Sequence, residues 1–170
     1  MHFLKEYSDV IEDLAIGAWV RFTEQYTNAP RLYEKIKGAR PERKHLAHYR
    51  RFLLEFHGNQ CFYCEWNFNG TAHVDHVIPW CYVLADRVWN LVLACKTCNA
   101  DKSNRTPTDH YINLLLDRNR KLPPDHKDLR EFSSKDLEEH IRTWVSNCRS
   151  DEFGVWNVPV ADNALIVLSD

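Results

Sequence analysis

The sequence of 170 residues has no run that approaches 18 consecutive apolar residues, which excludes a transmembrane helix. Its first residues lack a charged stretch followed by an apolar one, so we expect no secretory signal peptide. Internal repeats and low-complexity runs are also missing. Because hydrophobic residues make up 44% and charged residues 27%, the composition is that of a globular protein. We therefore expect a cytoplasmic protein with no membrane partner, built as one domain or one small domain with appendages.

The chain also lacks an overall basic character, since its net charge is −2, but its charge is unevenly distributed. Residues 31–51 carry eight Lys and Arg against two Glu, a local charge of +6. Four of these bases lie on one side of a helix that we expect from Pro41 to about His57: Arg43, Lys44, Arg50 and Arg51. Such a face fits the backbone of a polyanion, or it is only a solvated helix face; charge alone leaves both interpretations open.

The cysteines are arranged for a metal rather than for disulfides. Four of the six form two CxxC pairs, Cys61–Cys64 and Cys95–Cys98. Two thiolates at this spacing can hold one ion from a tight turn, and two such turns complete the tetrahedral site that structural zinc prefers. Cys81 and Cys148 stand alone, and we expect them to be buried thiols.

The residues between and after the two pairs offer a second kind of chemistry. Asp75 is a hard oxygen ligand suited to Mg²⁺, and its neighbour His76 is a base of near-neutral pKa. Asn99 directly follows a cysteine of the second pair, so zinc would fix its position and it could offer a second hard ligand. Lys102 lies about one helical turn further, where we expect it to meet a phosphate. His73 is open to two interpretations, an additional ligand or a structural histidine.

From Cys61 to about Arg105 the sequence resembles the HNH endonucleases of the ββα-metal type with a four-cysteine zinc. The resemblance rests on CxxC, then Asp-His-x-x-Pro, Asn-Leu, and CxxC-Asn-x-x-Lys, in that order. It implies an α+β fold: a ββα-metal core stapled by the zinc and flanked by N- and C-terminal helices. It also implies a catalytic set of His76, Asp75, Asn90 and Asn99. In this set His76 is the general base, Asp75 and Asn99 hold the divalent ion, and Asn90 ties the ββα loop together. Because the third signature position is Asn99, this is an H-N-N variant.

The resemblance implies a metal-dependent DNA endonuclease or nickase that leaves 5′-phosphate and 3′-hydroxyl ends. Its cofactors would be structural Zn²⁺ and catalytic Mg²⁺ or Mn²⁺. Its partner would be DNA, with Lys102 and Arg105 as the nearest phosphate contacts and the basic face of the preceding helix as a further one. Two other hypotheses stay open. The chain could be a catalytically silent, zinc-stabilised DNA-binding module, or the nuclease part of a larger bacterial or phage defence or restriction complex. A homo-oligomer is a further option.

The flanks divide the chain into three parts. We expect an N-terminal helical region over 1–57, a nuclease core over 58–107, and a C-terminal helical extension over 108–170 with a β-rich tail. Expected helices span 7–26, 30–37, 108–120 and 134–148. The first of these carries an apolar stripe, which includes Val10, Leu14 and Phe22.

Overall fold

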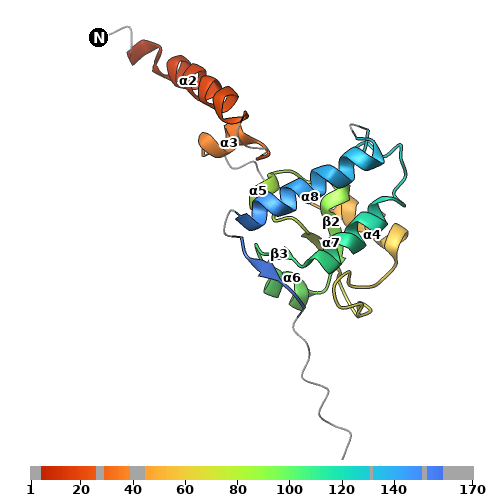
Figure 1. Ribbon diagram of the computed structural model, residues 1–170. Coiled ribbons are helices and arrows are strands. Elements are labelled where there is room, and N and C mark those ends of the chain that lie inside the picture. Colours follow the sequence, from red (N-terminus) through yellow and green to blue (C-terminus); the bar gives the residue numbers. More distant parts are fainter. Residues whose placement is uncertain (1–4, 26–28, 39–44, 131, 151–152, 159–170) are drawn as a thin grey trace, which may run out of the picture.

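The computed structural model describes residues 5–25, 29–38, 45–130, 132–150 and 153–158 (Figure 1). Within these residues, the chain forms helices and the strands of two two-stranded sheets. In order, the elements are α2 (Ser8–Thr23), α3 (Leu32–Ile36), α4 (Ala47–His57), β1 (His73–His76), α5 (Trp80–Val83), the 3₁₀ helix η1 (Val88–Asn90), β2 (Leu91–Ala94), α6 (Lys96–Lys102), β3 (Thr106–Pro107), α7 (Asp109–Asn119), α8 (Ser134–Ser150) and β4 (Val155–Trp156).

The centre of the molecule is a ββα unit made of β1, β2 and α6, which confirms the expected α+β fold class. The two strands pair antiparallel, with His73 opposite Ala94 and His76 opposite Leu91. All four residues of β2 are buried, as expected for a strand that is covered on both faces. Helix α6 begins two residues after β2 ends, so the sheet fixes where this helix starts.

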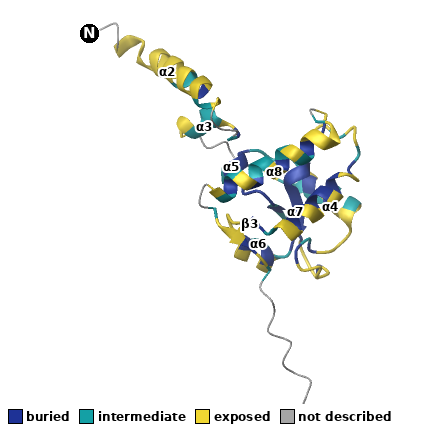
Figure 2. Ribbon diagram, in the orientation of Figure 1, coloured by how far each residue is buried: buried dark blue, intermediate teal, exposed yellow. Residues whose placement is uncertain are grey.

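Three longer helices surround this unit and share one buried core with it (Figure 2). The core takes Leu53 from α4, Leu115 from α7 and Ile141 from α8, each completely buried. The predicted helices over 108–120 and 134–148 are confirmed as α7 and α8. The division of the chain into three sequence regions stays a prediction, since the buried core includes residues from all of them.

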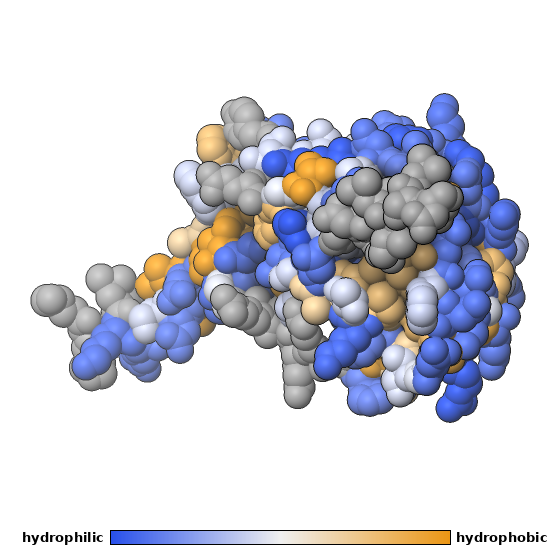
Figure 3. Space-filling view, turned by 90° about the horizontal axis from the view of Figure 1, so that it is seen from below, coloured by the Kyte–Doolittle hydropathy of each residue, from blue (hydrophilic) through white to orange (hydrophobic). Residues whose placement is uncertain are grey.

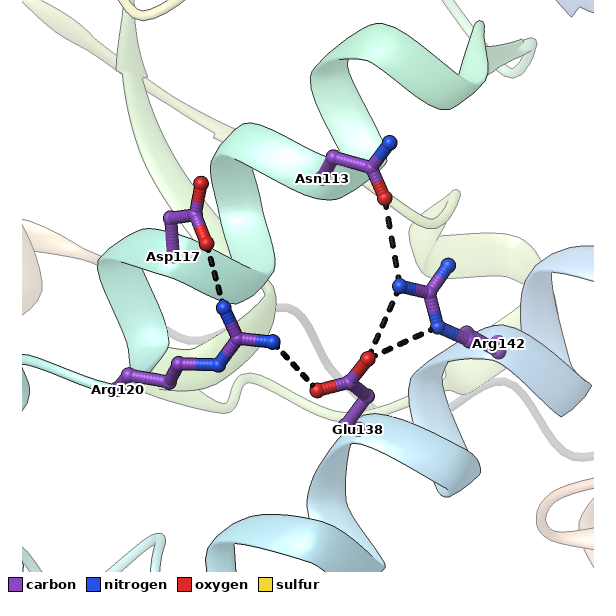
Figure 4. A network of polar contacts seen from close by, with 5 residues as sticks. All are labelled: Asn113, Asp117, Arg120, Glu138 and Arg142. Carbon is purple, nitrogen blue, oxygen red and sulfur yellow. Dashed lines mark hydrogen bonds and ion pairs between the residues drawn. The ribbon is translucent and has the colours of Figure 1, made fainter.

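The surface where α7 and α8 meet is held by charged side chains (Figure 4). Glu138 of α8 accepts hydrogen bonds from Arg120, just after α7, at 2.7 Å and from Arg142 at 2.9 Å. Arg120 also pairs with Asp117, and Arg142 reaches Asn113. The guanidinium groups lower the pKa of Glu138, so this carboxylate is charged at neutral pH. Exposed pairs of this kind each contribute little to the free energy of folding.

Buried Arg118 of α7 anchors the start of β2 from the other side. Its guanidinium donates hydrogen bonds to three backbone carbonyls, of Leu91, Val88 and Trp89, at 2.9 to 3.3 Å. Burial lowers the pKa of Arg118 to about 9, so the side chain stays charged at neutral pH. This cation therefore fixes the chain on either side of Asn90.

The C-terminal tail closes the fold through a second sheet. β4 pairs parallel with β3, with Thr106 opposite Val155. The Trp156 indole is buried and donates a 2.6 Å hydrogen bond to Asp101 of α6. The β-rich tail expected from the sequence therefore has an internal partner over 155–156, while residues 159–170 lie outside the described residues.

Helices α2 and α3 project from this body as an N-terminal arm (Figure 1). The predicted helix over 7–26 is confirmed as α2, but its apolar stripe is not in the core: Leu14 is 68% exposed and Val10 is 57% exposed. Hydrophobic side chains gather along this arm in Figure 3. Helix α2 contacts α3 through another side, where Asp13 accepts a hydrogen bond from Tyr33 at 3.0 Å and Val20 is the only buried residue of α2 among those described. Within the described part of the chain, no helix is long and apolar enough to cross a bilayer.

Helix α4 begins later than the sequence predicts, at Ala47 rather than at Pro41. The His45 ring nitrogen Nδ1 accepts the backbone N–H of Ala47 at 3.2 Å, which satisfies one of the unpaired donors of a helix start. The helix ends at His57, as expected, before Gly58 with a φ of 78°. Arg43 and Lys44, two of the four predicted DNA contacts in this region, lie outside the described residues.

Candidate functional site: a four-cysteine metal site beside a carboxylate–histidine cleft

The two CxxC turns converge on one point, and their geometry fits zinc. The sulfur atoms of Cys61, Cys64, Cys95 and Cys98 all lie within 4.8 Å of one another. Cys64 Sγ and Cys95 Sγ are 3.9 Å apart, close to the roughly 3.8 Å between sulfurs of a tetrahedral site with Zn–S bonds of about 2.3 Å. None of the six cysteines forms a disulfide. The four-cysteine site expected from the sequence is therefore preformed.

Local backbone geometry builds each turn. In the first turn, Glu65 adopts a left-handed φ of 58° and its N–H donates to the Cys61 carbonyl at 2.9 Å. In the second, Cys95 is the N-cap of α6, and its sulfur accepts the Cys98 N–H at 3.4 Å. Burial raises the pKa of the Cys61 and Cys98 thiols. Because thiolates are the zinc ligands, zinc binding would release protons from this site.

A cleft of about 330 Å³ lies next to the cysteines, between β1, the start of α5 and α6. The structure brings Asp75, His76 and Asn99 together in its wall. Asp75 and His76 come from β1, and Asn99 follows Cys98 in α6. A carboxylate and an amide oxygen are hard donors that suit Mg²⁺ or Mn²⁺, which keep several waters when only one or two protein ligands are offered. The donor set in this cleft therefore fits the divalent ion implied by the sequence.

Asp75 is buried and held by two side chains. The Tyr63 hydroxyl donates a 2.6 Å hydrogen bond to Asp75 Oδ2, and the Lys102 ammonium lies 3.1 Å from the same oxygen. Burial, and after it the Asp75 carboxylate, raises the pKa of Tyr63, which therefore stays a hydrogen-bond donor at neutral pH. Tyr63 lies inside the first CxxC turn, so a residue of the cysteine site directly orients the carboxylate of the cleft.

Lys102 has a different position from the one the sequence suggested. Its side chain is completely buried, and besides Asp75 it donates a 2.7 Å hydrogen bond to the backbone carbonyl of His76. The expected contact of Lys102 with a DNA phosphate does not agree with this position, because the ammonium is inside the protein and already paired. A buried cation is stable only with such partners, which explains why this lysine turns inward.

Asn90 closes the loop between the end of β1 and η1. Its side chain is completely buried, accepts the Ile78 N–H at 2.8 Å and donates to the Ile78 carbonyl at 2.9 Å. The Asn90 carbonyl in turn accepts the Val77 N–H at 2.9 Å. Both polar atoms of the side chain are therefore used within the protein, as expected of a residue that ties the loop and binds no metal.

The basic residues with described positions differ in exposure. Arg51 and Arg105 are exposed and Arg50 is half-buried, and none of the three lines the cleft. Arg105 is hydrogen-bonded to the Asp101 carbonyl one turn earlier in α6. His73 is exposed at the start of β1 and is not one of the cleft residues either.

Two side chains of the site were missed by sequence reasoning. Tyr63 gave no signal, because an aromatic residue inside a CxxC turn is equally compatible with simple packing. Asp86 is the other: its Oδ1 lies 2.9 Å from His76 Nε2. It comes from an irregular loop ten residues after His76, where no periodicity predicts which way a side chain points.

A comparison with known protein families agrees with the resemblance found in the sequence. Residues 64–108 match the model of the HNH endonuclease family. A comparison with curated proteins gives no match. Among solved structures, the chain is similar to the type II-C Cas9 enzyme from Actinomyces naeslundii, with 23% identity and a TM-score of 0.35. That match covers 83% of this chain and 17% of the Cas9 chain. The residues that match the HNH endonuclease family model, 64–108, are therefore the segment that contains β1, β2 and α6.

Proposed function

We propose that this chain is a metal-dependent DNA endonuclease or nickase that hydrolyses phosphodiester bonds in the cleft between β1 and α6. The observation that carries the proposal is that Asp75, His76 and Asn99 line one cleft beside the four-cysteine site, within the segment that matches the family. A zinc module that serves only as a scaffold has no need of this set of side chains.

In the proposed mechanism, Asp75 and Asn99 would hold a divalent ion. When bound, the ion would stabilise the negative charge that develops on the phosphate and on the departing 3′ oxygen. His76 accepts the proton of the attacking water, a step that typically contributes about 10²–10⁴-fold. Tyr63 and Lys102 hold the Asp75 carboxylate in its orientation. Lys102 is thus proposed as a partner of Asp75, in place of a phosphate contact.

DNA is the proposed substrate, and basic side chains outside the cleft lining are its proposed backbone contacts. These are Arg105 after α6 and Arg50 and Arg51 on α4, with Arg43 and Lys44 as further candidates from the sequence. Action within a larger complex, a role in defence and a cytoplasmic location remain predictions from the sequence.

The test is cleavage of supercoiled plasmid DNA by zinc-loaded protein with Mg²⁺, with Mn²⁺ or with EDTA. We expect nicked or linear product with either ion and none with EDTA. His76→Ala should lower the rate about 10²–10⁴-fold while zinc content and DNA binding stay close to wild type. His73→Ala, which removes an exposed histidine of the same strand, is the matched control and should cleave like wild type.

Two results would contradict the proposal. Cleavage by His76→Ala at the wild-type rate would mean that His76 is not the base. A wild-type protein that binds DNA but cleaves neither duplex nor single-stranded DNA with either ion would favour a catalytically silent binding module.

A further inference from the structure

The loop between α5 and η1 brings a second carboxylate to the proposed base. Asp86 Oδ1 lies 2.9 Å from His76 Nε2, and the two side chains are only 15% and 13% exposed. Asp86 also lines the same cleft as His76. Shielding from water strengthens a hydrogen bond of this kind and makes it selective for one orientation of the ring.

The backbone of this loop is fixed at several points, so Asp86 is held in place. Leu84 adopts a left-handed φ of 52°, and its N–H donates to the Trp80 carbonyl at 2.7 Å, which ends α5. The Tyr49 hydroxyl lies 3.0 Å from the Asp86 carbonyl oxygen and 2.9 Å from Oδ2 of buried Asp128. The same Asp128 oxygen accepts the Val88 N–H at 2.8 Å. Contacts from α4 and from the segment after α7 therefore hold the loop on both sides of Asp86.

The chemistry of this pair determines which ring nitrogen is left to react. An ionised carboxylate can only accept hydrogen bonds, so His76 Nε2 must carry the hydrogen. In a neutral imidazole the other nitrogen, Nδ1, then has the free lone pair. A partner on one ring nitrogen thus sets both the tautomer and the rotation of the ring, and a base works only when both suit the proton that it must accept.

We propose that Asp86 is the positioning residue of His76: its carboxylate holds the imidazole in the orientation and tautomer that leave Nδ1 free to accept a proton. This inference rests on the proposed function, because it concerns the same base. It assigns to Asp86 no contact with DNA and no bond to the metal ion.

The first test is steady-state cleavage by the zinc-loaded full chain with Mg²⁺. Asp86→Ala should lower kcat about 10–100-fold, the loss typical of removing a residue that orients a site ligand. KM for DNA should stay within about threefold, because substrate binding does not use Asp86. Asp86→Asn keeps an acceptor oxygen for the Nε2 hydrogen and should retain a larger share of kcat than Asp86→Ala. Asp117→Ala removes an exposed carboxylate of α7, away from the cleft, and should leave kcat unchanged.

The second test does not depend on cleavage. In ¹⁵N-histidine-labelled protein without DNA, the hydrogen on His76 Nε2 should exchange slowly enough to give a proton signal, which His76→Ala identifies by removing it. Asp86→Ala should lose this signal while its melting temperature stays near that of Asp117→Ala.

A kcat of Asp86→Ala equal to wild type, or a His76 Nε2–H signal that persists in that variant, would overturn the inference. A folded wild-type protein that shows the signal but cleaves no DNA would overturn the proposed function instead, while the bond between Asp86 and His76 would stand. The two failures are therefore distinguishable.

Discussion

Replacing Asn90 by alanine should destabilise the free protein, in the absence of any DNA or divalent ion. Asn90 is the only partner shown for both the N–H and the carbonyl of Ile78 within the described part of the chain, and Ile78 is itself completely buried. In Asn90→Ala both groups lose their hydrogen bonds without gaining access to water. An unpaired buried group costs about 1–3 kcal/mol, so the expected loss of unfolding free energy is about 2–6 kcal/mol. That is a large part of the roughly 5–15 kcal/mol that stabilises a domain of this size.

The assay is urea unfolding in zinc-containing buffer, followed by tryptophan fluorescence. Asn113→Ala, which removes an exposed asparagine whose side chain accepts a hydrogen bond from Arg142, is the matched control and should change stability by less than about 0.5 kcal/mol. A loss below about 1 kcal/mol in Asn90→Ala, with an unchanged m-value, would show that Asn90 does not hold the loop together.

Three further predictions concern the metals, the buried ion pair and pH. Brief EDTA treatment should stop cleavage while one zinc per chain and the circular dichroism spectrum persist, and added Mg²⁺ should restore cleavage. The Cys98→Ser variant should lose both its zinc and its fold. Elemental analysis measures the zinc, and circular dichroism measures the fold. Lys102→Met leaves the buried Asp75 carboxylate without its cation and should cost about 3–5 kcal/mol in urea unfolding at pH 7, whereas a loss under about 1 kcal/mol would contradict the buried pair. Burial lowers the pKa of His140 among aromatic rings, so below its ordinary pKa of about 6.5 the unfolded chain binds a proton that the folded chain excludes. Stability should therefore fall as pH drops from 7.5 to 5.5, and it should fall less steeply in His140→Phe; equal slopes would refute this assignment.

Short-range motifs explain why much of the core could be predicted from sequence. A CxxC turn fixes the positions of two ligands through local geometry alone. A residue that directly follows a ligand, such as Asn99, must then lie next to the metal site. Asp75 and His76 are adjacent in sequence, so both come with β1, and the structure shows both in the wall of the cleft. Each of these predictions needed only a few consecutive residues.

Positions that depend on distant contacts could not be predicted in this way. Helical spacing placed Lys102 near the site, but only the three-dimensional structure shows that Asp75 and the His76 carbonyl draw it inside. The apolar stripe of α2 predicted the helix correctly, but periodicity says only which face is apolar and not what covers it. Asp86 meets His76 through a loop whose path is fixed by contacts from α4 and from residues beyond α7.

The position of Trp156 has a consequence for the order in which this protein can mature during synthesis. Its indole binds Asp101 of α6, and its ring packs edge-on against Tyr63, with ring centres 5.0 Å apart. Tyr63 orients Asp75, and α6 carries Asn99, so Trp156 supports both sides of the cleft. Trp156 lies more than 50 residues after Asn99 in the sequence and is therefore synthesised later. A nascent chain that has emerged only as far as α8 carries all the proposed catalytic side chains but lacks this brace. The cleft therefore reaches its final geometry only when the last described strand has left the ribosome.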